Sequence, residues 1–204
     1  MYVIAVGGDF KLTSRFFVPI SGMMAVMATL ALLRLYQWRR SVAAMISVLA
    51  LVMYGWHYER SLTWAKNRHQ NWLARRAAGL MIASTTPANT IIAVRSVGVL
   101  PYYANRYTID MWGLTDRTIA MTPVADFGTG MAGHERQNHA YVFQLNPDIY
   151  IPEDNVIGLE AVMQPIEPGF PDDFAKRYSP KSVKIGASWF NIWVRNGFPQ
   201  DKSY

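Results

Sequence analysis

The sequence predicts a membrane α-helical hairpin, made of two transmembrane helices, followed by a soluble α/β domain. Two observations predict this fold class. Two stretches of eighteen residues without a charged side chain lie near the amino terminus, and short apolar runs alternate with helical patterns in the rest of the chain. The 204 residues are 51% hydrophobic and 17% charged, which excludes a disordered chain, and the lack of cysteine excludes a disulfide scaffold.

The charge of the chain is distributed unevenly. Residues 1 to 76 carry ten Lys and Arg against two Asp and Glu, whereas residues 77 to 204 carry ten against twelve. The basic excess lies around the two apolar stretches and does not cover a whole folded body. It therefore favours a lipid bilayer, and no nucleic acid, as a partner.

Residues 1 to 15 are predicted to form an interfacial loop after a truncated membrane element. Tyr2 to Val6 is apolar and ends at two glycines, like the last turns of an element whose beginning is absent. We therefore expect the chain to be the C-terminal piece of a longer polytopic protein. Asp9 and Arg15 in this loop are either ligand-binding groups or simple interfacial charges.

Residues 16 to 58 are predicted to contain two transmembrane helices joined by a short basic linker. As helices, Phe16 to Leu33 and Ser41 to Tyr58 would each cover roughly 27 Å, close to the roughly 30 Å of hydrocarbon in a bilayer. Aromatic residues lie at the ends of both stretches, as is typical of a membrane interface. A buried helical hairpin of a soluble protein is the alternative interpretation.

The linker is expected to be the seven residues from Arg34 to Arg40, which contain three arginines. Such a short linker predicts an antiparallel helix pair, which places residues 1 to 15 and residues 59 to 204 in the same compartment. The count of Lys and Arg on the two sides, taken literally, favours a cytoplasmic domain.

Residues 59 to 204 are predicted to form one soluble α/β domain that opens with a basic helix from Glu59 to about Ile82. This helix either binds the phosphates of an anionic lipid or connects the parts of the chain by packing on its own domain. The residues available for its buried or interfacial face are Leu62, Ala65, Trp72, Leu73 and Leu80.

Short apolar runs in the domain predict strands that alternate with helices. Prolines between residues 165 and 180 leave an irregular stretch without an assignment. The expected elements are strands at Thr90–Val94, Tyr107–Met111 and Asp148–Ile151, a loop or short helix at Val97–Tyr103, a helix at His134–Leu145, and a hairpin of Ser182–Gly186 with Phe190–Val194 around Ala187–Trp189.

Three patterns resemble known motifs but lack the context that their chemistry needs. Gly7 to Phe10 has no second acidic residue for dinucleotide cyclisation. The GxGxxG run from Gly128 to Gly133 follows no clear strand, although Asp148 lies twenty residues after its first glycine, so we expect a flexible glycine loop. His134 and His139 would lie roughly 140° apart on a helix and cannot bind one metal from the same face. We expect no cofactor and no metal site.

Two carboxylates flank the end of the second predicted strand and the glycine turn that follows it. Asp110 and Asp116 are at the position where α/β domains place ligand-binding groups. The alternative for Asp116 is that it caps a helix that starts at Arg117.

Four groups of segments together resemble a known family. They are Gly7–Phe10 with Ser14–Phe16 and Pro19, Val97–Tyr103, Ile109–Asp116 with Ile119 and Ala120, and Gly133–Arg136 with Ala140–Val142 and Pro147–Asp148. They resemble the C-terminal part of bacterial polytopic membrane glycosyltransferases of the terminal arabinofuranosyltransferase family (GT-C type). Arg136 stands where the resemblance leads us to expect lysine.

The resemblance implies an inner-membrane, multi-pass enzyme with its C-terminal domain in the periplasm. Such an enzyme transfers a sugar from a polyprenyl-phosphate donor to a cell-envelope glycan. Its catalytic acidic residue is expected in a first extracytoplasmic loop, which this chain lacks, so the fragment alone is expected to be inactive. In this interpretation Arg15 contacts the phosphate, Asp9 accepts a sugar hydroxyl, and Asp116 and His134 contact the acceptor glycan.

Two other classes of function remain open from the sequence. The chain is alternatively a non-catalytic, membrane-anchored periplasmic binding or scaffolding module for envelope assembly, or a cytoplasmic sensor domain. Coding sequence upstream of Met1 with further membrane helices and an acidic loop would favour the enzyme.

Overall fold

The computed structural model describes residues 18–125, 127–130, 134–152, 157–162, 166 and 169–199. The chain divides into two compact units, Met1–Arg68 and His69–Tyr204. One helix, α3 (Arg40–Thr85), contributes residues to both units and has no break in its 46 residues. Residues Asp9 and Arg15, to which the sequence assigns substrate contacts, lie outside the described residues.

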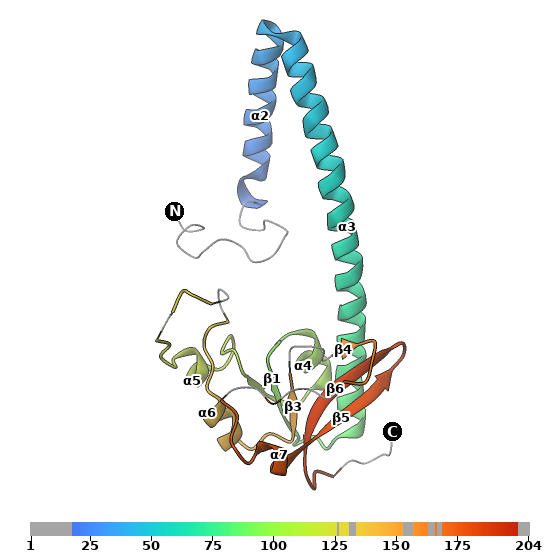
Figure 1. Ribbon diagram of the computed structural model, residues 1–204, viewed down its shortest axis with the longest axis vertical. Helices are drawn as coiled ribbons and strands as arrows, with labels where there is room; N and C mark the ends of the chain where they lie inside the picture. Colours follow the sequence, from blue (N-terminus) through green and yellow to red (C-terminus); the bar gives the residue numbers. More distant parts are fainter. Residues whose placement is uncertain are drawn as a thin grey trace. The chain divides into compact units, whose positions relative to one another are not determined.

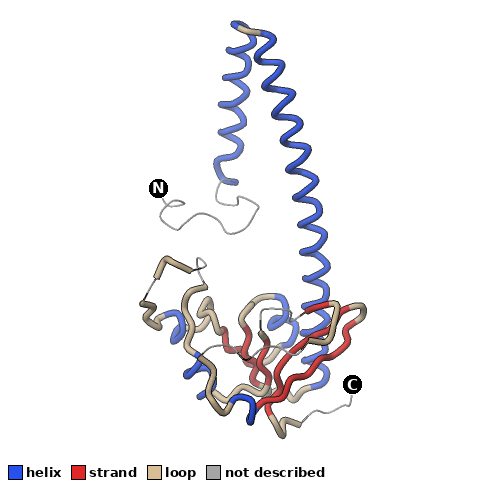
Figure 2. Tube along the Cα trace, viewed as in Figure 1, coloured by secondary structure: helices blue, strands red, loops and turns tan. Residues whose placement is uncertain are grey.

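The first unit consists of α2 (Val18–Trp38) and the amino-terminal part of α3, which run in opposite directions in Figures 1 and 2. Both helices are long and apolar enough to cross a membrane. Most of the seven residues expected to link the two apolar stretches are helical, because α2 extends to Trp38 and α3 begins at Arg40, which leaves only Arg39 between the helices. Arginine is a good helix former, so a cluster of arginines does not end a helix.

Most large apolar side chains of this unit are exposed. No residue of α2 is buried, and Met23 on α2 and Leu51 on α3 are 68% and 70% exposed. Three hydroxyl groups here donate within their own helix: Ser21 to the Val18 carbonyl at 2.8 Å, Thr29 to the Ala25 carbonyl at 2.9 Å and Ser47 to the Ala43 carbonyl at 2.9 Å. Internal satisfaction of polar groups is what an apolar environment requires of a helix.

The carboxyl-terminal part of α3 packs on the sheet of the second unit through small residues. Ala78 and Ile82 are buried in the core, and a Cβ on Gly79 would lie 2.5 Å from the carbonyl oxygen of Leu100. The packing of this helix on its own domain is therefore confirmed at this end. The large residues that were expected on a buried or interfacial face are exposed by 38 to 45%, so they do not form a buried face. These residues are Leu62, Trp72, Leu73 and Leu80.

The second unit is a mixed α/β sheet domain, so a pair of long apolar helices followed by an α/β domain is confirmed (Figure 1). Its strands are β1 (Ile91–Val94), β2 (Tyr107–Asp110), β3 (Ile149–Ile151), β4 (Ile157–Gly158), β5 (Tyr178–Ile185) and β6 (Ser188–Arg195). Its short helices are α4 (Val99–Ala104), α5 (Arg117–Ala120), α6 (His139–Gln144) and α7 (Phe174–Arg177).

The sheet has a parallel part and an antiparallel part. β1 lies between β2 and β3 and is parallel to both. One edge of β6 pairs with β3 and β4, which follow each other along it, and the other edge pairs with β5 over its full length. β5 therefore forms an edge of the sheet, where Pro180, which lacks an N–H group, is tolerated.

Apolar clusters cover both faces of the sheet and give three layers. Alternate residues of β1 point to opposite faces: Ile92 and Val94 pack with α3 and α4, whereas Ala93 packs with the helices on the other side. The second cluster is rich in aromatic rings. It includes Phe143, Tyr150, Phe174, Tyr178 and Trp193.

Most of the predicted elements of the domain are confirmed, with three corrections. The three parallel strands, the short helix after β1 and the C-terminal hairpin are present. The helix predicted from His134 begins only at His139, where the Asn138 side chain accepts a hydrogen bond from Tyr141 N and caps it. The hairpin turns at Gly186 and Ala187, and its first strand begins at Tyr178 within the stretch that the prolines had left unassigned.

Candidate functional site

The carboxyl ends of the three parallel strands form the candidate site. The chain leaves β1 to form β2 on one side of it and later forms β3 on the other side, so the connections diverge beside the end of β1. In open α/β sheets, ligands bind at such a divergence. Arg95 follows β1 directly, and the turn from Met111 to Asp116 follows β2.

Asp110, the last residue of β2, shapes this turn. Its side chain is fully buried, and Oδ1 accepts a hydrogen bond from Trp112 N at 3.1 Å. Oδ2 accepts from both the backbone N–H and the hydroxyl of Thr115, at 2.6 and 3.0 Å. Gly113 has a φ of 69°, and a Cβ there would lie 2.6 Å from Ala120 N. Both oxygens of Asp110 therefore hold the turn.

Asp116 caps α5, which confirms the alternative interpretation of this residue. Its Oδ1 accepts a hydrogen bond from Ile119 N at 3.1 Å, and its carbonyl accepts one from Ala120 N at 2.9 Å. The carboxylate is half-buried, and Oδ2 makes no hydrogen bond to the described part of the chain. This geometry leaves one acceptor oxygen for a ligand.

His134 lies against the same turn. Its ring is 4.3 Å from the ring of Trp112, centroid to centroid, and the two planes are nearly perpendicular at 86°. Both side chains are half-buried, and the exposed side chain of Leu114 lies within the turn. Of the four predicted contact residues, the structure thus brings His134 and Asp116 to one turn, around Trp112, a residue that sequence reasoning did not select.

The glycine run next to this turn is folded around a carboxylate of the chain itself. Glu135 Oε1 accepts hydrogen bonds from Gly128 N at 2.8 Å and Gly130 N at 2.7 Å. The neighbouring Arg136 donates to the Thr122 carbonyl at 3.0 Å and lies 5.3 Å over the ring of Phe127. The described part of the run is therefore a loop held by Glu135 and Arg136.

His139 and Arg95 are further candidate members of the site: sequence reasoning weighed His139 only as a metal ligand and did not select Arg95. The His139 ring packs 5.0 Å from the ring of Phe170, and its Nε2 lies 3.1 Å from Gln137 Oε1. Burial lowers the pKa of His139, and the positive charge of Arg95 lowers it further. Arg95 could have been selected from the sequence, because it directly follows a predicted buried strand, where α/β domains place ligand-binding groups.

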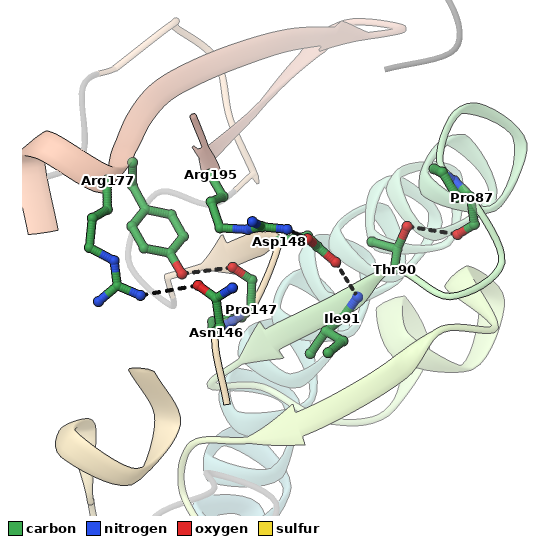
Figure 3. A network of polar contacts seen from close by, with 9 residues as sticks. Pro87, Thr90, Ile91, Asn146, Pro147, Asp148, Arg177 and Arg195 are labelled. Carbon is green, nitrogen blue, oxygen red and sulfur yellow. Dashed lines mark hydrogen bonds and ion pairs between the residues drawn. The ribbon is translucent and has the colours of Figure 1, made fainter. Parts of the chain in front are cut away.

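The opposite, amino-terminal edge of the parallel strands holds a polar network with a structural role (Figure 3). The Asp148 carboxylate accepts a hydrogen bond from Ile91 N at 2.8 Å and is paired with Arg195, so it joins β1, β3 and β6. Tyr178 donates to the Pro147 carbonyl at 2.7 Å, and burial raises its pKa to about 12. Asp148 thus lies at the edge opposite to the candidate site, and its carboxylate is engaged there.

Comparison with known proteins decides the family. A family model described as "Domain of unknown function (DUF8728)" matches residues 58–199. The chain belongs to the DUF8728 family. No curated protein and no solved structure matches the chain. The matched range takes in α3 from Tyr58 onward and the sheet domain, and therefore the whole candidate site of the DUF8728 domain.

Proposed function

We propose that the chain is the membrane-anchored C-terminal part of a glycosyltransferase, in which the DUF8728 domain contacts a cell-envelope glycan acceptor. The sugar comes from a polyprenyl-phosphate donor in the inner membrane. The observation that carries the proposal is the Trp112–His134 ring pair in the turn that leads to Asp116, at the carboxyl ends of the parallel strands and in one chain with two long apolar helices.

Exposure of apolar side chains supports the membrane anchor. A large aliphatic side chain gains about 1.5 to 3 kcal/mol when it is removed from water. On α2 and the first half of α3 such side chains are exposed over most of the helix surface, which water would oppose and hydrocarbon would favour. The proposed location is the inner membrane with the domain in the periplasm.

The chemistry of the ring pair fits a sugar. One face of a sugar ring presents C–H groups, which pack on an aromatic ring, while its hydroxyls donate to carboxylate oxygens. Trp112 offers the ring, Asp116 Oδ2 offers an acceptor, and the imidazole of His134 offers a further polar contact. In this proposal Arg15 offsets the negative charge of the leaving phosphate and Asp9 accepts a sugar hydroxyl.

A titration of the full chain in detergent micelles with a short oligoarabinofuranoside tests the proposal. We expect binding in the millimolar range or tighter, seen by calorimetry or by shifts of the Trp112 and His134 resonances. Trp112→Ala should weaken binding about tenfold or more, as expected for loss of a ring that lies at the centre of a site. Tyr102→Ala, which removes an aromatic ring that is 78% exposed on α4, is the matched control. Equal binding by both variants would contradict the assignment.

A non-catalytic envelope-binding module is the second candidate. It is favoured because the carboxylates at the strand ends have structural partners: Asp110 holds its turn through both oxygens, and Asp116 caps α5. Coding sequence upstream of Met1 separates the two candidates. Further membrane helices with an acidic loop favour the transferase, and in that parent protein Arg15→Ala should abolish transfer from the lipid donor.

A further inference from the structure

Aromatic and arginine side chains alternate every four residues along α3. Trp56 is followed by Arg60, Trp64 and Arg68. The Arg60 guanidinium lies 5.6 Å over the Trp56 ring, and the Arg68 guanidinium lies 5.2 Å over the Trp64 ring. We call this segment, Trp56 to Arg68, the Trp–Arg segment.

The four-residue spacing of Trp and Arg continues past this segment, but the side chains there pack on another helix. Trp72 and Arg76 both contact Tyr103 of α4, at 6.2 Å between ring centroids and 5.2 Å from guanidinium to ring. Those two side chains therefore pack within the sheet domain. By contrast, Trp56 is 67% exposed, and the Arg60 and Arg68 side chains lie over rings of their own helix.

The Trp–Arg segment is positively charged and its cations are available. Glu59 is the one acidic residue between Arg40 and Thr85, whereas Arg60, Lys66 and Arg68 lie within three turns of each other. In the described residues neither Arg60 nor Arg68 forms an ion pair with a carboxylate. A guanidinium stacked on a ring keeps its N–H edges free for two parallel hydrogen bonds to a phosphate.

A second group of stacked arginines lies at the other end of the apolar part of α3. Arg39 lies 5.9 Å from the ring of Trp38, and Arg40 lies 5.6 Å from the ring of Tyr36. The twenty residues from Arg40 to Arg60 span roughly 30 Å of helix, which matches the roughly 30 Å of hydrocarbon in a bilayer. This spacing puts Arg40 and Arg60 at the two headgroup layers of a bilayer that α3 crosses.

We infer that the Trp–Arg segment binds the phosphate groups of anionic phospholipids. The inference rests on the membrane anchor of the proposed function but not on glycosyl transfer. In a bilayer that α3 crosses, the Trp56 ring lies at the boundary between hydrocarbon and headgroups, which indole prefers, and holds Arg60 at the level of the phosphates. Trp64 and Arg68 each lie eight residues, or roughly 12 Å, farther along the helix, on the aqueous side of the headgroup layer, where Arg68 attracts the same anionic surface. A cation beside an anionic membrane surface strengthens binding about fivefold.

Native mass spectrometry of the full chain, released from detergent micelles, tests the inference. The probes are dioleoyl phosphatidylglycerol and dioleoyl phosphatidylcholine, which share acyl chains and differ in headgroup charge. The wild-type chain should bind the anionic lipid about tenfold or more tightly than the zwitterionic one. The double variant Arg60→Gln/Arg68→Gln should reduce this preference to within about twofold.

Two further variants separate a specific site from general charge. Lys66→Gln removes one positive charge from the same segment without removing a cation–π pair, and it should keep most of the preference. Trp64→Leu leaves every charge in place and should reduce the preference, because the Arg68 guanidinium loses its support. Circular dichroism checks that each variant keeps its helix content.

Three outcomes would overturn the inference. They are equal affinity of the wild type for both lipids, a loss in Lys66→Gln as large as that in the double variant, and displacement of the anionic lipid by inorganic phosphate at about the concentration of the lipid phosphate. Failure of the membrane anchor itself gives a different result, because the chain would then stay monodisperse in buffer without detergent.

Discussion

The apolar hairpin and the DUF8728 sheet domain bury their hydrophobic residues in opposite ways. Val18 to Trp38 contains no buried residue, whereas Tyr150, Phe174 and Phe190 of the domain are almost completely buried. In the domain, β3 and most of β6 are buried over consecutive residues between the layers that cover the sheet; in α2, apolar residues occupy all sides of the helix and none is buried. The comparison teaches that the two regions are suited to different solvents.

The strongest test of this comparison is removal of detergent. We expect the full chain to be monodisperse in mild detergent and to aggregate when the detergent is removed, because the exposed side chains of α2 and α3 then meet water. Size-exclusion chromatography with light scattering measures the outcome. A monodisperse chain in plain buffer would show that the hairpin is not a membrane segment.

The next largest effect is expected from a cavity in the aromatic cluster. Phe174→Ala should lower the free energy of unfolding of the domain by about 3 to 5 kcal/mol, because Phe174 is 1% exposed and lies against five other aromatic rings. Leu33→Ala on α2, at a side chain that is 56% exposed, is the control and should change it by less than about 0.5 kcal/mol. Urea unfolding in micelles, followed by near-ultraviolet circular dichroism, measures both. Equal losses would mean that the two regions are not packed differently.

Two glycines of one helix sharpen the comparison. Gly79→Ala should destabilise the domain by about 1 to 3 kcal/mol, since its Cβ would meet the Leu100 carbonyl at 2.5 Å. Gly55→Ala places a Cβ where no atom lies within 4 Å, and should be neutral or stabilise the helix by up to about 1 kcal/mol. Thermal unfolding in micelles compares them. A Gly79→Ala variant as stable as Gly55→Ala would contradict the close contact between α3 and α4.

The smallest expected effect is a pH dependence confined to the domain. The pKa of folded His139 is lowered from 6.5, so the unfolded chain binds the proton more readily. The contribution of His139 to the free energy of unfolding is therefore fully present above pH 6.5, and it is lost as the pH falls through the lowered pKa of the folded state. Urea midpoints at several pH values should show a slope that His139→Gln reduces. His69→Gln, at an exposed site on α3, is the control and should leave the slope unchanged.

The sequence predicted the strands that are short continuous apolar runs. The runs Ile91–Val94, Tyr107–Asp110 and Ile149–Ile151 are short and rich in β-branched residues, and each forms a buried parallel strand. The buried face of α3 could not be predicted in the same way. Close approach to α4 needs small residues such as Gly79, whereas a search by hydrophobicity favours large ones such as Trp72 and Leu73.

The candidate site was predictable only where a local rule applies. The capping role of Asp116 follows from its place one residue before a helix. The contacts of Trp112 with His134 and the effect of Arg95 on His139 join residues that are far apart in the chain. No spacing rule reports such contacts, because they depend on how the turns after β1 and β2 fold.

The edge of the sheet at β5 has a consequence for how copies of the protein meet. An open strand can add a strand from a neighbouring copy, which is a common route to aggregation. Pro180 withholds a hydrogen-bond donor from any added strand, and the charges of Lys181 and Lys184 repel their counterparts on a second β5. Crowded copies should thus remain separate at this side of the sheet, without a partner to cover it.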